Sequence, residues 1–194
     1  MIVLASQSGS RKAMLEAAGI SFEAQPADID ERQLEASLGM APPASVAVAL
    51  ARAKAEAVSC LRPGELVLGS DSLVEVEGQR FDKPRSREEA VEHLRFFSGK
   101  VLQLHSAAAL VRDADCLWQD HARSDMQVIE LSNDFIEGYL EHEWPEVSGC
   151  VGVFRIEGRG VQLFEAIEGD QFTVLGMPLL KVLGALRNLG EIAS

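Results

Sequence analysis

The sequence predicts a mixed α/β fold, built on a mixed twisted sheet with flanking helices. Two observations carry this prediction: apolar strand-like and amphipathic helix-like segments alternate in the first half of the chain, and hairpin-like strand pairs dominate the middle. We expect helices at 11–18, 45–61, 87–97, 134–142 and 178–189, and strands at 2–5, 66–70, 101–112, 117–130, 150–156 and 161–167. Ligands of such folds bind near the carboxyl ends of the strands.

Residues with known capping preferences mark the ends of these segments. Gly19 stops the first helix, and Pro63-Gly64 separates the second helix from the strand at 66–70. Ser86 and Glu89 have the spacing of a capping box and open the helix at 87–97. The last helix starts at Pro178, a residue favoured in the first helical turn.

Composition indicates an ordinary globular protein. The chain has 194 residues, 47% of them hydrophobic and 25% charged, which suits a single domain over 1–194 with a sizeable core, or two small lobes around a cleft. The net charge of −12 disfavours binding to polymeric nucleic acid or an anionic membrane. We find no membrane-spanning run and no signal peptide, and three well-separated cysteines fit a reducing cytoplasm.

The stretch "LASQSGSRK" at 4–12 is a candidate phosphate-binding loop. A short strand leads through a Ser/Gly turn into a helix whose first turn carries Arg11 and Lys12. Helix N-termini attract anions, and cations placed there oppose the helix dipole, so they make sense if an anion sits in front of them. The alternative is that Ser10 is only an N-cap and the cations are solvated. The residues alone support both interpretations.

Lys54 is a second candidate for binding phosphate. The row Leu50, Lys54, Val58 and Leu61 has helical spacing, so this lysine lies on a mostly apolar stripe. It could aim its ammonium group into a cleft, or it could bury its stem and keep the ammonium in water.

The motif "GSDS" at 69–72 places Asp71 at the end of a buried strand. A carboxylate there could accept a proton from water, ligate Mg²⁺ or act as a nucleophile, or it could merely cap a turn. Metal sites for phosphate chemistry need only one or two carboxylates besides substrate oxygens and water, so Asp71 with Glu31 would suffice. Lys83, before a proline across the hairpin, could neutralise a phosphate.

Seven ordered segments together resemble the Maf-like proteins, a family of nucleotide pyrophosphatases. They are "LASQSGSRKAMLEAAGISF", "DIDE", "LARAKA", "GSDS", "DKPRSREEAVEHLRFFSG", "IEGRG" and "IEGDQFTVLGMPLL", and they cover Leu4 to about Leu186. The resemblance implies hydrolysis of a nucleoside triphosphate to the monophosphate and pyrophosphate. It also implies two lobes around a deep cleft, a divalent metal (Mg²⁺ or Mn²⁺) and a homodimer.

Residue roles follow from the resemblance position by position. Asp71 matches the catalytic acid, and Glu31 matches the acid of an Asp-Glu pair that would contact the metal together with it. The phosphate-binding positions correspond to Ser8, Arg11, Lys54 and Lys83. The positions that choose the base correspond to Arg11, Ser72 and Glu157.

Glu157 points to one branch of the family. The segment "RIEG" ends in Glu-Gly, as in the branch acting on 7-methyl-GTP, whereas the dTTP/UTP branch has Gln-Gly. A glutamate can accept two hydrogen bonds from the N1–H and amino group of a guanine edge, and its charge suits a positive N7-methylated ring. We therefore expect a modified purine nucleotide such as 7-methyl-GTP as substrate, so that the enzyme would clear such nucleotides from the pool.

Two rival functions remain open at the level of sequence. One is a catalytically weak nucleotide-binding regulator of cell division (septum formation), which Gly9 and Leu102 allow, because many relatives have proline and histidine there. The other is a phosphatase or phosphotransferase with Asp71 as nucleophile, although the usual Asp-x-Asp pair is missing. Orthophosphate or pyrophosphate as product would separate these possibilities.

Overall fold

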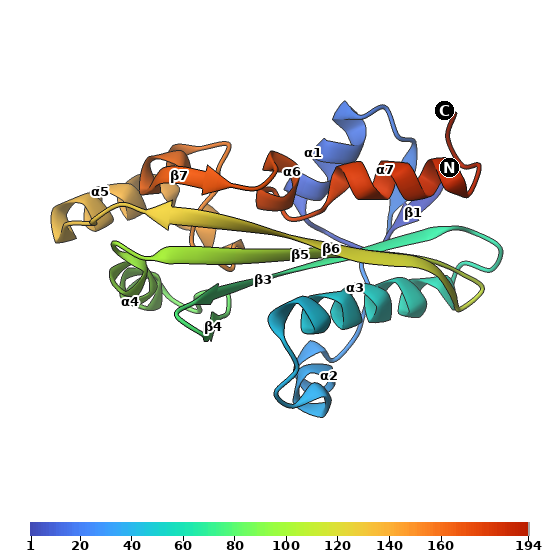
Figure 1. Ribbon diagram of the computed structural model, residues 1–194, viewed down its shortest axis with the longest axis horizontal. Coiled ribbons are helices and arrows are strands. Elements are labelled where there is room, and N and C mark those ends of the chain that lie inside the picture. Colours follow the sequence, from blue (N-terminus) through green and yellow to red (C-terminus); the bar gives the residue numbers. More distant parts are fainter. Residues whose placement is uncertain (194) are drawn as a thin grey trace. The chain divides into compact units, whose positions relative to one another are not determined.

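A seven-stranded mixed sheet forms the centre of the computed structural model, which describes residues 1–193 (Figure 1). The strands are β1 (Ile2–Leu4), β2 (Phe22–Ala24), β3 (Val67–Val76), β4 (Gln79–Phe81), β5 (Val101–Arg112), β6 (Asp115–Val128) and β7 (Phe164–Glu168). Their order is β2-β1-β3-β5-β6-β7, and β4 pairs with β3. β1 runs parallel to β2 and β3, whereas β4 and β7 pair in antiparallel fashion. The mixed α/β class predicted from the sequence is confirmed.

The chain divides into two compact units. Unit 1 comprises Met1–Ser72, His105–Ala122 and Gln171–Ser194, and unit 2 comprises Leu73–Leu104 and Arg123–Asp170. The division reflects internal contacts and does not define independently folding domains, so the single domain predicted for 1–194 stays a prediction. The cleft implied by the family resemblance likewise stays a prediction.

Unit 1 has a helix layer on each face of its strands (Figure 1). Its helices are α1 (Gly9–Ala17), α2 (Glu31–Leu38), α3 (Pro43–Ser59), α6 (Gln171–Val174) and α7 (Leu179–Asn188). Because side chains alternate along a strand, Leu68 packs with α1 and α7, while its neighbour Val67 packs with α3. Two apolar layers therefore hold β3 firmly where it reaches Asp71.

Unit 2 contains α4 (Arg87–Phe97), α5 (Asn133–Glu143) and two 3₁₀ turns (Glu146–Gly149 and Arg159–Leu163). The bounds of α4 agree with the prediction, and Ser86 Oγ accepts a hydrogen bond from Glu89 N at 3.2 Å. In a full capping box the Glu89 carboxylate would accept from the backbone N–H of Ser86. Here it accepts instead from Arg85 N, one residue earlier, at 2.7 Å.

Several short elements differ from the prediction. The expected strand at 150–156 is irregular, and Val153 has a φ of 56° there, which no strand accommodates. The expected strand at 161–167 begins with a 3₁₀ turn and becomes β7. Helix α2 was not predicted. Its only large apolar residues are Leu34 and Leu38, none of its residues is buried, and its N-cap Asp30 accepts from Gln33 N at 2.9 Å. Within 1–193, no helix is long and apolar enough to cross a membrane.

Candidate active site

The close approach of α3 to β3 occurs at Gly69. A Cβ atom at this position would lie 2.1 Å from Ala51 O and 2.8 Å from Ala55 N, both in the backbone of α3. Only glycine allows the helix to lie this close to the strand. The contact brings the helix residue Lys54 beside the strand residue Asp71.

Lys54 holds two carboxylates together. Its Nζ lies 2.5 Å from Asp71 Oδ1 and 2.9 Å from Glu31 Oε1. The side chains of Lys54 and Asp71 are 13% and 9% exposed, so this pair is largely withdrawn from water, while Glu31 is half exposed. Of the two interpretations of Lys54, the structure excludes the one in which its ammonium is simply solvated.

The two carboxylates have the donor set that a divalent metal with substrate oxygens requires. Because Asp71 and Glu31 both reach one ammonium group, they converge on a position that already holds positive charge. Among residues 1–193, no group of three or more His, Cys, Asp or Glu side chains could hold a metal. Two carboxylates fit Mg²⁺ or Mn²⁺ only when phosphate oxygens and water complete the shell.

Helix α1 begins at the loop predicted to bind phosphate. Ser8, and not Ser10, is the N-cap, and its Oγ accepts from Arg11 N at 3.4 Å. The Arg11 side chain turns away from solvent and binds four protein oxygens. Its Nε donates to Gly176 O (2.9 Å), Nη1 to Ser70 O (2.9 Å) and Ser6 Oγ (3.3 Å), and Nη2 to Ser72 Oγ (3.1 Å).

Arg11 interacts electrostatically with the cluster formed by Lys54, Asp71 and Glu31. Burial lowers the pKa of its guanidinium, and the negative charges of Asp71 and Glu31 oppose that shift. An arginine keeps its charge in proteins, so Arg11 adds a second cation to the same neighbourhood. Unit 1 thus brings together Ser8, Arg11, Glu31, Lys54, Asp71 and Ser72, six of the eight predicted site residues.

The other two predicted residues, Lys83 and Glu157, belong to unit 2. Both act on the half-buried thiol of Cys150: burial raises the pKa of that thiol, the charge of Glu157 raises it further, and Lys83 lowers it. The two side chains therefore share one neighbourhood within unit 2. Their roles in the site stay predictions.

Glu143 organises the loop that carries Glu157, and sequence reasoning missed it. The Glu143 carboxylate is buried, accepts from Arg155 Nε at 2.9 Å, and accepts from Arg159 N at 3.0 Å. It thereby fixes the chain on both sides of Glu157. A glutamate in an amphipathic helix resembles a surface residue, so no local signal could have identified it.

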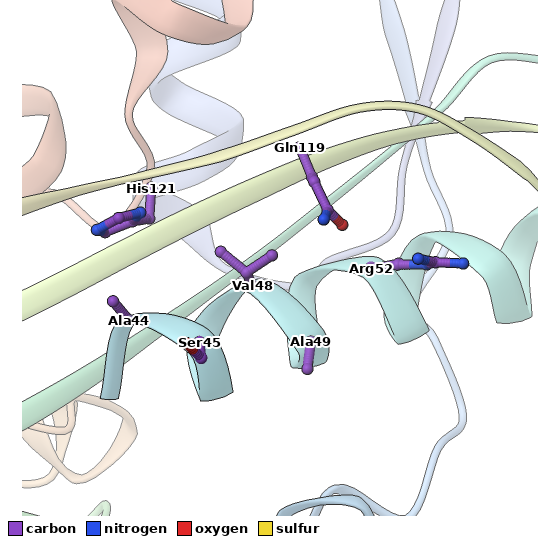
Figure 2. Close-up of a pocket in the computed structure, with 7 residues that line it drawn as sticks. All are labelled: Ala44, Ser45, Val48, Ala49, Arg52, Gln119 and His121. Atoms are coloured by element: carbon purple, nitrogen blue, oxygen red, sulfur yellow. The ribbon is translucent and has the colours of Figure 1, made fainter. Parts of the chain in front are cut away.

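A separate pocket of about 390 Å³ lies in unit 1 between α3 and β6 (Figure 2). Its lining residues are Ala44, Ser45, Val48, Ala49, Arg52, Gln119 and His121. None of them is a carboxylate, and His121 is the one lining residue that titrates near neutral pH. It contains none of the predicted site residues, and we do not identify it with the active site.

The chain belongs to the Maf-like protein family, whose model matches residues 1–189. A relative from Nitrobacter hamburgensis, named nucleoside triphosphate pyrophosphatase, is 47% identical over 99% of this chain and 95% of its own length. Relatives from Rhizobium etli and Mesorhizobium japonicum, both named 7-methyl-GTP pyrophosphatase, are 46% and 48% identical over 98% of this chain and 97% of their own lengths.

One solved structure, a Mycobacterium abscessus nucleoside-triphosphatase / dITP/XTP pyrophosphatase, is 16% identical with a TM-score of 0.37. The match covers 67% of this chain and 74% of that one. A TM-score this low supports no argument about the present chain.

Proposed function

We propose that this protein is a nucleoside triphosphate pyrophosphatase, which hydrolyses the α–β phosphoanhydride to release the nucleoside monophosphate and pyrophosphate. The observation that carries the proposal is the cluster of Lys54, Asp71 and Glu31 beside Arg11 within unit 1. It combines a withdrawn carboxylate with cations, which is what attack of water on a polyphosphate needs. Family membership and the names of the relatives support the same reaction.

We assign to Asp71 the role of orienting and deprotonating the attacking water. Its Oδ1 is held by Lys54, and no protein group within 1–193 is bonded to its Oδ2, which can therefore orient a water molecule and accept its proton. The water oxygen attacks the α-phosphorus, and the bond from that phosphorus to the bridging oxygen breaks. Lys54 and Arg11, with Lys83 as predicted, offset the charge that collects on the leaving pyrophosphate.

A divalent cation is part of the proposal. Held by Asp71, Glu31 and substrate oxygens, it would neutralise charge on the transferred phosphoryl group. Treatment with EDTA is expected to lower pyrophosphate release by at least about 100-fold, because Mg²⁺ or Mn²⁺ supplies several kcal/mol of electrostatic stabilisation. Turnover should return when either metal is added in excess. Full turnover in EDTA would contradict the metal assignment.

We infer a preference for a 7-methylated guanine nucleotide, with Glu157 contacting the base. Replacing Glu157 with glutamine exchanges one acceptor for a donor, which mismatches a guanine edge and suits uracil or thymine. The ratio of kcat/KM for 7-methyl-GTP over UTP is expected to fall by about tenfold or more. Exposed Glu137→Gln on α5 serves as the control, since within 1–193 its carboxylate binds Arg87 and no other group. An unchanged ratio in Glu157→Gln would contradict base contact.

Product analysis with purified protein, Mg²⁺ and a nucleotide panel that includes 7-methyl-GTP tests the reaction itself. We expect equimolar monophosphate and pyrophosphate. Orthophosphate with a trappable aspartyl phosphate would instead indicate a phosphatase, and nucleotide binding without turnover would indicate a regulator such as one acting in cell division. We further propose that the protein acts in the cytoplasm, as a homodimer.

A further inference from the structure

The backbone carbonyl of Gly176 connects the residues around Arg11. Its oxygen accepts three hydrogen bonds: from Arg11 Nε at 2.9 Å, from Ser72 Oγ at 3.0 Å and from Ser70 Oγ at 3.1 Å. Gly176 lies in the short connection between α6 and α7, far from α1 and β3 in the sequence. One carbonyl group therefore fixes side chains from two other elements of unit 1.

The hydroxyl of Ser72 is fully used by these contacts. A serine has one proton, and both Gly176 O and Ser106 Oγ lie 3.0 Å from it as acceptors, while the oxygen accepts from Arg11 Nη2 at 3.1 Å. Ser106 can direct its own proton to Thr173 O at 2.8 Å. Ser72 thus has no spare donor for a nucleotide base, and its contacts serve to orient Arg11.

Arg11 keeps one donor for a ligand. A guanidinium has five N–H groups, and within 1–193 four of them have protein acceptors: one on Nε, two on Nη1 and one on Nη2. The remaining Nη2 hydrogen has a direction fixed by the other four. An acceptor oxygen on the substrate must therefore come to it, because the guanidinium cannot turn to follow.

Only glycine fits at position 176. Its φ is +101°, a conformation that side-chain-bearing residues rarely adopt, and a Cβ atom would lie 3.2 Å from Ser72 Oγ and 3.8 Å from Arg11 Nε. A side chain would therefore both strain the backbone and push against the two residues that its carbonyl holds.

We propose that Gly176 is a positioning residue for substrate selection: its carbonyl, with Ser72 as intermediary, sets the direction of the single free donor of Arg11. The inference rests on the proposed function and on the base-choosing role that the family resemblance implies for Arg11. It changes the role of Ser72 from reading the base to holding Arg11.

Gly176→Ala tests the inference, with Gly19→Ala as the matched control. Both glycines have positive φ, but a Cβ at Gly19 meets nothing within 4 Å, so the control carries backbone strain without the contact to Ser72. We expect Gly176→Ala to raise KM for 7-methyl-GTP about tenfold with kcat within about twofold, because a misdirected donor weakens ground state and transition state alike. Gly19→Ala should keep the wild-type KM.

Calorimetric binding of the α,β-methylene analogue of 7-methyl-GTP, compared with that of UTP, separates this inference from the proposed reaction. The Kd for the 7-methyl-GTP analogue should rise about tenfold in Gly176→Ala, and the preference over the UTP analogue should shrink. This readout holds even if the wild type releases no pyrophosphate, a result that would reject only the proposed reaction. A wild type that binds neither analogue would overturn both.

Ser70→Ala keeps the inference falsifiable if Gly176→Ala does not fold. Ser70 is buried and shares its proton between Ala107 O at 2.8 Å and Gly176 O at 3.1 Å, so its removal loosens the carbonyl without adding atoms. We expect the Kd to rise about threefold. A Kd and a selectivity equal to those of the wild type in every folded variant would overturn the inference.

Discussion

Replacing Asp71 with asparagine is expected to lower kcat for pyrophosphate release by about 10³-fold. Asparagine keeps the size of the side chain and an oxygen that can accept from Lys54, but it neither takes a proton from water nor supplies a charged metal ligand. Lys54 retains Glu31 at 2.9 Å, so the substitution does not leave an unpaired buried cation. Steady-state kinetics with pyrophosphate detection measure the effect.

The matched control for this substitution is Asp115→Asn, at the exposed start of β6. It removes one negative charge from the same unit and should leave kcat unchanged. The Asp71→Asn protein should also melt within a few degrees of the wild type and still bind nucleotide. A folded Asp71→Asn variant with kcat within tenfold of the wild type would remove Asp71 from the reaction.

The candidate site residues that stand out in the sequence are those that interrupt a regular pattern. Asp71 follows an apolar run, and Lys54 interrupts an apolar helical stripe, so each stands out against neighbours that are buried for plain reasons. The pattern could not show that these side chains contact one another. The Lys54–Asp71 contact depends on the missing side chain at Gly69, and the Lys54–Glu31 contact depends on a helix that has no buried residue.

Residues whose roles depend on contacts with distant segments could not be identified from the sequence pattern. Gly176 contributes a carbonyl oxygen, which every residue type has. A glycine at that position therefore indicates only that the backbone can adopt a positive φ there. Glu143 resembles a solvent-facing helix residue until the structure places Arg155 and Arg159 against it. Such contacts join distant segments, and single-sequence reasoning contains no information about that pairing.

The irregular stretch around Phe154 shows a related limit. Val151, Val153 and Phe154 favour a strand by type, and burial of Val153 and Phe154 is consistent with that. Phe154 packs edge-on against Phe164 with ring centroids 4.9 Å apart, and a Cβ at Gly152 would lie 2.5 Å from its ring. Packing of one aromatic ring therefore overrides the local preference for a strand.

Gly69→Ala is expected to destabilise the protein by about 3 kcal/mol or more and to lower activity together with stability. The added methyl group would meet the backbone of α3, at 2.1 Å from Ala51 O, and a helix backbone cannot move aside as a flexible side chain can. The helix must shift away from β3, which separates Lys54 from Asp71. Chemical denaturation gives the loss in unfolding free energy, and KM and kcat report the separation.

Gly184→Ala in α7 is the control, because a Cβ there meets nothing within 4 Å. It should be neutral or stabilise the protein by up to about 1 kcal/mol, since alanine favours a helix over glycine. The contrast tests one physical claim: the candidate active site forms because a helix can touch a strand at a residue without a side chain. If Gly69→Ala matched Gly184→Ala in stability and turnover, α3 and β3 would not be held in the contact that joins Lys54 to Asp71.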